Sequence, residues 1–401
     1  LPILEKYQIP ATIFVCTGNI GTENEFWWDM LENLLLSNKE KYLTWNALSD
    51  ERDKVLDRYL NLQESLKTLN VHDRMAIFKQ FGCSQEPRKN YRSLNSEELK
   101  KLKSPLFNRS INGLYSPGST IKPLVALSSI QNKIINPEDE IYAGPYFQLP
   151  NSPRRFRDWK PEGHGMVDLN KAIVQSCDVY FYKLADRLGI EKLSNFFEHF
   201  SFGKKTGIDM PYESKGVLPS NEWKQKNIGY KWTDGDTVIT GIGQGFFLAT
   251  PLQLAYATSI LANKGVISIP KLNKKSVPKK SKDILNREEF FKKNITDMDW
   301  DIITNAMFDV VNKENGTAYW SIRDKKNNIA GKTGTVQVYS LSQETDERDE
   351  ENIPEHLKDH SLYVAFAPKE DPKIVIATVI ENVGSGSKFA APISNKIINF
   401  Y

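Results

Sequence analysis

A serine and a lysine three residues apart, Ser119 and Lys122, follow a Pro-Gly pair in the stretch YSPGSTIKPL. If a helix begins at Ser119, the lysine lies one turn along it on the same face as the serine. Pro123 fits this placement, because a missing backbone N–H costs least in the first turn. A serine is a weak nucleophile unless a neighbour takes its proton, which a lysine can do if its surroundings lower its pKa. The spacing therefore indicates a candidate nucleophile and base, with two ordinary residues at a helix start as the alternative.

Two further groups of polar residues could join this pair. Ser176 and Asp178 interrupt the apolar helical pattern KAIVQSCDVYFYKLADRLG, where a helix N-cap or a partly exposed turn is the alternative interpretation. The stretch GKTGT at 331–335 opens a predicted strand and offers one ammonium group and two hydroxyls to a carboxylate. A glycine at such a position allows a ligand close to the backbone, although an ordinary strand entry has the same composition.

The elements that must position these residues follow from the hydrophobic pattern. Three stretches, 332–340, 361–368 and 373–382, have strand character and are separated by polar loops, so they predict antiparallel neighbours. Residues 171–189 predict one helix closed by Gly189, and the final NKIINF predicts a packing helix. The pattern as a whole predicts an α+β fold, a helical cluster against an antiparallel sheet.

Composition excludes several classes of protein. The 401 residues are 40% hydrophobic and 26% charged, which suits two or three globular domains with sizeable cores. The net charge of +3 is too small to imply nucleic acid as a partner, and three cysteines do not indicate a disulfide framework. We find no apolar run as long as a membrane span and no signal peptide, so we expect neither an anchor nor a signal segment in this chain.

The polar motifs occur in the order S-x-x-K, S-x-D and K-T-G-T. This order resembles the penicillin-recognising serine enzymes, in which serine and lysine form an acylation pair. The stretches LYSPGSTIKPLVAL, WTDGDTVITGIGQGFFLATPLQLA and AGKTGTVQV narrow the resemblance to class B penicillin-binding proteins of the penicillin-binding protein 2 type, over residues 106–401. The resemblance implies the penicillin-binding transpeptidase fold, here without its N-terminal strands.

The resemblance also implies an activity, the D,D-transpeptidation of peptidoglycan in cell elongation and shape. Ser119 is expected to be the acylated nucleophile and Lys122 its general base. Ser176, with Asp178 in the same motif, is expected to help proton transfer to the leaving amine. A serine β-lactamase and an inactive chimeric product are the alternatives, the first of which needs a deacylating carboxylate such as Glu213 or Glu222.

The same resemblance implies the ligands and partners. Lys332, Thr333, Gly334 and Thr335 are expected to bind the terminal carboxylate of a stem peptide, and the N–H groups of Ser119 and Thr335 to form an oxyanion hole. We expect stem peptides and β-lactams as ligands, and membrane proteins of the elongation complex as partners. The family acts at the periplasmic face of the bacterial inner membrane, and its chemistry requires no cofactor.

One group of residues could nevertheless bind a structural zinc ion. Asp158, His164 and Cys177 are ligand types that suit zinc, and Cys177 adjoins Ser176. The resemblance implies an aspartate where this chain has Ala143, so a fourth ligand would have to come from Asp139, Glu140 or water. A hydrogen-bonded polar cluster without metal is the alternative.

Residues 1–105 have a different character. LPILEKYQIPATIFVCTGNIGTENEFWWDMLENLL and YRSLNSEELKKLKSP resemble the middle of a polysaccharide deacetylase domain. The Asp and His motifs that bind the metal of those enzymes are absent from this stretch. We therefore expect a truncated, inactive α/β segment joined to the transpeptidase near 105/106, either by a real gene fusion or by an assembly artefact. Its strand ATIFVCT could pair with the open edge of the transpeptidase sheet.

Overall fold

The computed structural model describes residues 108–272, 279–322, 326–338, 353–354 and 357–400, together with the backbone of one strand at 11–16. The chain divides into two units, residues 1–17 with 108–401, and residues 18–107. Apart from its strand, the deacetylase-like segment lies outside the described residues, so its nature and the boundary at 105/106 stay predictions. Within the described ranges, none of the helices has the length and apolar character needed to cross a membrane.

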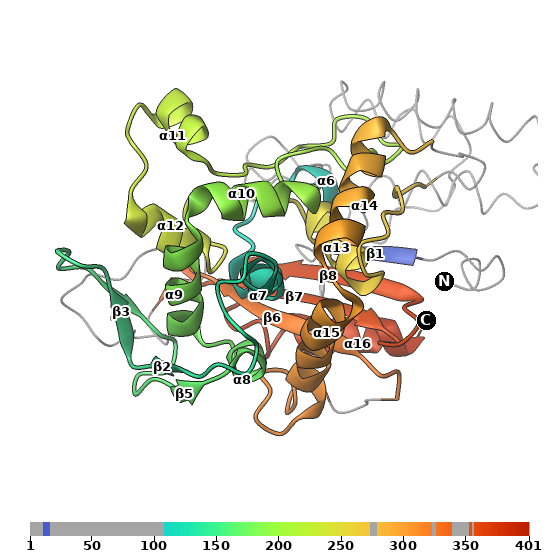
Figure 1. The fold of residues 1–401 in the computed structure, drawn as a ribbon. Coiled ribbons are helices and arrows are strands. Elements are labelled where there is room, and N and C mark those ends of the chain that lie inside the picture. Colours follow the sequence, from blue (N-terminus) through green and yellow to red (C-terminus); the bar gives the residue numbers. More distant parts are fainter. Residues whose placement is uncertain are drawn as a thin grey trace, which may run out of the picture. The chain divides into compact units, whose positions relative to one another are not determined.

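A mixed sheet forms the centre of the first unit (Figure 1). β6 (Ala330–Val336), β7 (His360–Ala367) and β8 (Ile374–Ile380) are consecutive antiparallel neighbours, which confirms the three predicted strands. β1 (Ala11–Cys16) pairs with β8 in parallel, giving the order β1-β8-β7-β6 among the described strands. The edge of β8 is thus covered by the strand that we considered for it.

Helices surround this sheet, and two small sheets lie apart from it. The helices are α6 (Arg109–Asn112), α7 (Lys122–Gln131), α8 (Leu169–Val174), α9 (Asp178–Leu188), α10 (Ile190–His199), α11 (Asn221–Ile228), α12 (Asp234–Thr240), α13 (Pro251–Ala262), α14 (Lys282–Asn294), α15 (Asp297–Asn312) and α16 (Ala390–Phe400), with a 3₁₀ turn, η1 (Gly118–Ile121). The small sheets pair β2 (Ile141–Ala143) with β5 (Gly165–Val167) and β3 (Tyr146–Gln148) with β4 (Arg155–Arg157). This arrangement confirms the α+β fold, and α16 confirms the predicted final helix.

The two faces of the sheet are covered by different helices. Val364 of β7 lines a pocket together with Leu254 of α13, so this face packs on α13. Thr378 of β8 follows the residue paired with Val364 and therefore points to the opposite face, where its hydroxyl bonds Ser394 of α16 at 2.7 Å. Because both faces are covered, every residue of β8 is buried, and the sheet is a rigid support for what lies at its edge.

Two predicted helix boundaries were wrong. The predicted helix at 171–189 is broken between α8 and α9, because Ser176 adopts a positive φ of 56°. Each half has its own cap: the Asp168 carboxylate accepts the Lys171 N–H, and the Cys177 thiol accepts the Tyr180 N–H. The predicted helix start at Ser119 is the 3₁₀ turn η1, and α7 begins at Lys122.

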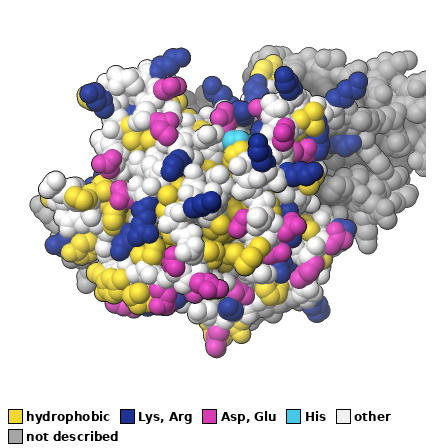
Figure 2. Space-filling view, viewed as in Figure 1, with side chains coloured by type: hydrophobic (Ala, Val, Ile, Leu, Met, Phe, Trp, Pro, Cys, Tyr) yellow, Lys and Arg dark blue, Asp and Glu magenta, His cyan; other side chains and the backbone are white. Residues whose placement is uncertain are grey.

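The small sheets present apolar side chains to solvent. Tyr142 and Met166 are direct neighbours across β2 and β5, and both are exposed. Trp159, in the loop between β4 and β5, is also exposed. In Figure 2, hydrophobic side chains gather at the lower left of this face, the side on which Figure 1 places β2, β3 and β5.

Candidate active site

The turn that carries Ser119 is fixed by backbone contacts on both sides. The Gly118 N–H donates to the Gly243 carbonyl at 2.7 Å, and a Cβ on Gly243 would lie 2.3 Å from the Gly118 oxygen. A Cβ on Gly118, whose φ is +56°, would lie 2.8 Å from Val336 Cγ2. Only glycine fits these close approaches, and they place Ser119 beside the end of β6.

Lys122 lies one turn along, and its ammonium group is fully engaged. The side chain is completely buried, and Nζ donates to the Ser176 carbonyl at 2.8 Å, to Ser176 Oγ at 3.2 Å and to Asp178 Oδ1 at 2.7 Å. Among the described residues Ser119 Oγ has no hydrogen-bond partner. The structure therefore directs the Lys122 amine at Ser176 and Asp178 and leaves the Ser119 hydroxyl without a bond.

Ser176 is the meeting point of two lysines. Lys332 of β6 is also completely buried, and its Nζ donates to Ser176 Oγ at 2.8 Å. Because Ser176 Oγ accepts from both ammonium groups, its own hydrogen must point away from them. The positive φ of Ser176 is what turns this side chain toward both lysines at the break between α8 and α9.

The electrostatics of this cluster oppose full ionisation. Burial lowers the pKa of Lys332 well below its ordinary value, and the neighbouring charge of Lys122 lowers it further, while Asp178 acts in the opposite direction. Burial likewise raises the pKa of Asp178, against the attraction of the Lys122 ammonium. Such shifted groups in mutual contact are typical of sites that move protons.

The rest of the third motif extends from this cluster. Thr333 is buried, and its Oγ1 lies 2.8 Å from Thr317 Oγ1. Gly334 passes so close to η1 that a Cβ there would meet Thr120 Cγ2 at 2.9 Å. Thr335 is exposed, and its hydroxyl accepts the Gly386 N–H at 3.2 Å. The structure thus joins Lys122, Ser176, Asp178 and Lys332 by direct bonds and places Ser119 and Thr335 at the rim; their chemical roles stay predictions.

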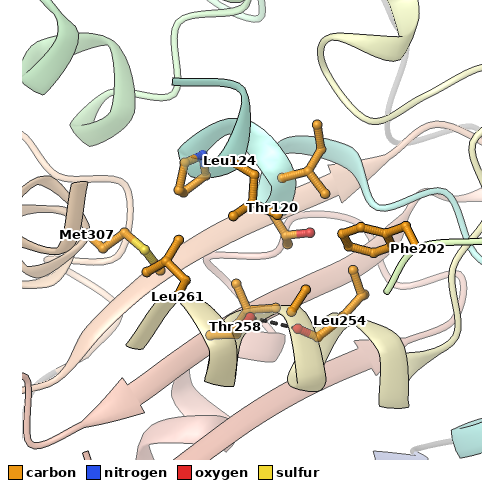
Figure 3. Close-up of a pocket in the computed structure, with 11 residues that line it drawn as sticks. Thr120, Leu124, Phe202, Leu254, Thr258, Leu261 and Met307 are labelled. Atoms are coloured by element: carbon orange, nitrogen blue, oxygen red, sulfur yellow. Dashed lines mark hydrogen bonds between the residues drawn. The ribbon is translucent and has the colours of Figure 1, made fainter. Parts of the chain in front are cut away.

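An apolar pocket lies behind the nucleophile turn, between α7 and α13 (Figure 3). Thr120 and Leu124 line it from one side, Leu254 and Leu261 from the other, and Met307 and Phe202 close its ends. Neither Ser119 nor Lys332 lines this pocket. It lies between η1, α7 and α13, and therefore lies apart from the buried contacts of Lys122, Ser176 and Lys332.

A second buried polar cluster lies on the other side of Ser176. One ligand atom each of Asp158, His164 and Cys177 lies within 4.8 Å of the others, and all three residues are buried. Asp158 accepts the Cys177 thiol at 3.3 Å and the Val179 N–H at 3.0 Å. Neither ring nitrogen of His164 has a hydrogen-bond partner, although Nδ1 lies 3.3 Å from Asp158 Oδ1.

The expected fourth ligand of this cluster does not appear among the described residues. Ala143 is buried directly beside it, and its carbonyl accepts the His164 N–H at 2.8 Å, but its side chain is a methyl group. Asp139 and Glu140 are both exposed, and the Asp139 carboxylate caps Asn136 instead. The potential metal ligands that the described residues bring together are therefore Asp158, His164 and Cys177 alone.

Titration also distinguishes this cluster. Burial raises the pKa of Cys177 well above its ordinary value, and the Asp158 charge raises it further. Burial alone would raise the pKa of Asp158, but the nearby imidazole of His164 and hydrogen bonds from the Val179 and Lys160 N–H groups lower it on balance. A protonated thiol and an ionised carboxylate suit the hydrogen bond seen, whereas a cation would be needed to ionise the thiol.

Sequence reasoning missed several residues of the site. Trp159 donates its indole N–H to the Gln175 carbonyl at 3.1 Å and packs edge-on against His164. Gly243 belongs to GIGQG, which resembles a nucleotide loop but here supports Gly118. Thr317 stands in an unremarkable polar stretch. No local pattern marks these contacts, because each depends on chain segments that are distant in sequence.

The carboxylates considered for a β-lactamase do not join the cluster. Glu213 is buried, and its oxygens accept the Thr206 N–H and hydroxyl and the Gly207 N–H. Glu222 is exposed in the first turn of α11. Glu213 is thus fully engaged away from the cluster, and among the described residues no bond joins Glu222 to Ser119, Lys122 or Ser176.

Comparison with known proteins gives one consistent result. The penicillin-binding protein transpeptidase domain model matches residues 83–399, which begin before the predicted boundary at 105/106. The peptidoglycan D,D-transpeptidase MrdA of Haemophilus influenzae is 40% identical over 315 residues, covering 77% of this chain and 48% of the relative. MrdA of Acinetobacter baumannii is 41% identical over 309 residues, covering 76% and 45%. The chain thus spans about half the length of the curated relatives it matches.

Solved structures agree with the sequence matches. Pseudomonas aeruginosa PBP2 in complex with WCK 5153 is 36% identical, with a TM-score of 0.64 over 76% of this chain and 64% of that one. The complex between PBP2 and MreC from Helicobacter pylori is 36% identical, with a TM-score of 0.62 over 76% and 54%.

Proposed function

Since the chain belongs to the penicillin-binding protein transpeptidase family, we propose that it is a peptidoglycan D,D-transpeptidase of the cell-elongation type. The observation that carries this proposal is the chain of contacts from Lys332 through Ser176 Oγ to Lys122, at 2.8 and 3.2 Å. It joins all three motifs at one buried point beside Ser119. A structural role alone would not require two buried lysines on one hydroxyl, because each buried charge costs free energy.

The acylation step follows from these contacts. Lys122, once it has given up a proton, takes the hydrogen of Ser119, whose Oγ then attacks the penultimate carbonyl of a D-Ala–D-Ala stem peptide. The N–H groups of Ser119 and Thr335 are proposed to stabilise the oxyanion. Ser176 Oγ gives its hydrogen to the nitrogen of the leaving D-Ala and is reprotonated by Lys122. Lys332, Thr333 and Thr335 bind the terminal carboxylate.

The second step consumes the acyl-enzyme. An amine of another stem peptide attacks the ester carbonyl of acylated Ser119, forms the cross-linking amide, and loses a proton to Lys122 by way of the same hydroxyl. Ser119 leaves as the alcohol and the site is restored. β-Lactams acylate the same oxygen but leave no departing amine, so their ester persists.

Fluorescent penicillin labelling tests this proposal. The parent protein should become covalently labelled, and Ser119→Ala should abolish the labelling because the acylated oxygen is gone. Ser129→Ala is a suitable control, since Ser129 lies in α7 and its hydroxyl bonds only its own helix, at the Val125 carbonyl. Labelling that survives in Ser119→Ala, or peptide mapping of the label to another residue, would remove the assignment.

The lifetime of the adduct separates the transpeptidase from a β-lactamase. We expect the penicilloyl ester to last for hours, because Glu213 is held by Thr206 and Gly207, and Glu222 is exposed on α11 without a bond to the cluster. Release within seconds, followed by mass spectrometry of the intact protein, would instead favour a β-lactamase.

The partners and location are proposed from the relatives. A structure of PBP2 with MreC exists for the Helicobacter pylori relative, and we propose that this chain works with comparable elongation proteins at the periplasmic face of the inner membrane. The direct test is whether this chain co-purifies with such a protein from source cells. The co-purification should be lost when the complex is dissociated chemically.

We also propose that Asp158, His164 and Cys177 bind a structural zinc ion. The support is the unpartnered buried imidazole of His164, together with three donor types that zinc accepts. Bound zinc would ionise the Cys177 thiol and neutralise Asp158 in the interior. The catalytic steps above do not pass through it.

Metal analysis of the purified protein decides this point. We expect close to one zinc per chain in the parent protein and under a tenth of an equivalent in Cys177→Ser. Lys192→Ser, an exposed change on α10, should retain the metal. Less than a tenth of an equivalent in the parent would leave the hydrogen-bonded cluster as the better description.

A further inference from the structure

Thr317 occupies a turn whose backbone is fixed from several sides. The turn follows α15, and a Cβ at Gly316 would lie only 2.3 Å from the Val310 carbonyl oxygen. The next residue, Ala318, is completely buried and donates its N–H to the same carbonyl at 3.1 Å. The backbone of Thr317 therefore has little freedom to move, and the fold fixes the direction of its side chain.

The same residue connects two of the three catalytic motifs. Its N–H donates to the carbonyl of Val174 at 3.2 Å, at the end of α8 and two residues before Ser176. Its Oγ1 lies 2.8 Å from Oγ1 of Thr333, at the position proposed to bind the carboxylate. Thr317 is thus bonded to the backbone that leads into the second motif and to a side chain of the third.

The direction of the hydroxyl–hydroxyl bond depends on what Thr333 must do. A carboxylate only accepts hydrogen bonds, so Thr333 Oγ1 must donate its single hydrogen to a bound carboxylate. Its bond with Thr317 can then persist only if Thr317 is the donor. A carboxylate ligand therefore selects one direction, from Thr317 to Thr333 to ligand, in which each bond strengthens the next.

We propose that Thr317 is a positioning residue that orients the Thr333 hydroxyl toward the ligand and thereby makes the site selective for a carboxylate-terminated peptide or β-lactam. The inference rests on the proposed function, because it assigns Thr333 to carboxylate binding. It adds a residue outside the three motifs, on a different segment of the chain, to the machinery of recognition.

A pair of matched ligands tests the role. The acylation rate constant at low concentration is measured for a penicillin and for its methyl ester, in the parent, Thr317→Val and Thr317→Ser. Thr317→Val removes the donor but keeps the shape, so acylation by the acid should fall by roughly 5- to 10-fold, about the value of one hydrogen bond between neutral groups. The ester, which has no anionic carboxylate, should change by less than about 2-fold on the same scale. Thr317→Ser retains a hydroxyl and should restore most of the selectivity.

Two further variants separate orientation from general damage. Thr304→Val makes the same chemical change at a buried threonine of α15 that bonds its own helix, and it should leave both rates unchanged. In a Thr333→Val background, Thr317→Val should no longer alter the ratio of acid to ester.

The possible failures are distinguishable. Equal losses for acid and ester, or no loss for either, would overturn the positioning role while leaving the transpeptidase in place. A parent protein that neither compound acylates would overturn the proposed function, and this inference with it.

Discussion

Two buried polar clusters share one short turn, and they differ in how completely they are satisfied. Ser176 and Asp178 face the lysines, while Cys177 between them faces Asp158 and His164. In the first cluster Lys122 and Lys332 both have acceptors within hydrogen-bond distance. In the second, both nitrogens of His164 lack a hydrogen-bond partner.

The difference indicates two kinds of work. A cluster that satisfies its own donors and acceptors needs nothing from outside until a substrate disturbs it, which suits proton transfer. A cluster in which a buried imidazole has no hydrogen-bond partner is incomplete by itself, because each unpaired buried polar atom lowers the stability of the fold. The side chains of Ser176, Cys177 and Asp178 point alternately to the two clusters, so one short turn contributes to both.

The largest expected effect breaks the first cluster. Lys122→Met keeps the length of the side chain but removes the base, so acylation by penicillin should fall by about 100- to 10,000-fold. Lys192→Met, on the exposed side of α10, should change nothing. Stopped-flow or gel-based acylation measures the effect, with circular dichroism to show that the variant is folded. A loss under 10-fold would mean that another group takes the proton.

A smaller expected effect is the pH dependence of carboxylate preference, which tests the role of Lys332. Its ammonium must be protonated to attract a carboxylate, and burial lowers its pKa below 10.5, with Lys122 lowering and Asp178 raising it. Preference for a penicillin over its methyl ester should therefore be full at a pH below this lowered pKa and be lost as the pH rises through it, a loss that begins below 10.5. The ratio of the two acylation rates cancels changes in the base itself.

Lys332→Arg provides the control for that profile. A guanidinium stays protonated throughout the range, so the variant should keep a flat ratio even if its rates are lower. A ratio that is flat to pH 10.5 in the parent protein would show that Lys332 does not bind the carboxylate as an ammonium.

The smallest effect concerns the second cluster and appears in stability. Asp158→Asn keeps the shape of the side chain but replaces one of its two acceptor oxygens by an NH₂ group. The two oxygens accept hydrogen bonds from the Val179 and Lys160 N–H groups and from the Cys177 thiol. We expect a loss of about 1 to 3 kcal/mol in the free energy of unfolding, measured with urea. Acylation of the folded protein should change far less than in Lys122→Met. A fall in acylation as large as that one would mean that the two clusters are not separable.

Sequence reasoning recovered what depends on local pattern. The strands β6 to β8 follow from alternating and apolar runs, and the Ser119–Lys122 spacing follows from helical geometry. The break at Ser176 was missed, because the apolar residues on both sides continue in helical register while the left-handed turn is imposed by tertiary bonds. Thr317 and Gly243 could not be found at all, since a hydroxyl or glycine in a loop acquires its role only from the partner that folding brings to it. The nature of residues 1–105 remains a prediction that rests on the resemblance alone.

The occupied ammonium group of Lys122 has a consequence for chemical selectivity. Its Nζ already contacts three acceptors on Ser176 and Asp178, and Ser119 Oγ has no hydrogen-bond partner among the described residues until that arrangement is disturbed. A small electrophile such as a sulfonyl fluoride lacks the carboxylate that would engage Lys332 and the third motif, and so has no means of disturbing it. The resting site is therefore expected to be inert toward general serine reagents. It should become reactive only toward molecules that carry a carboxylate able to engage Lys332.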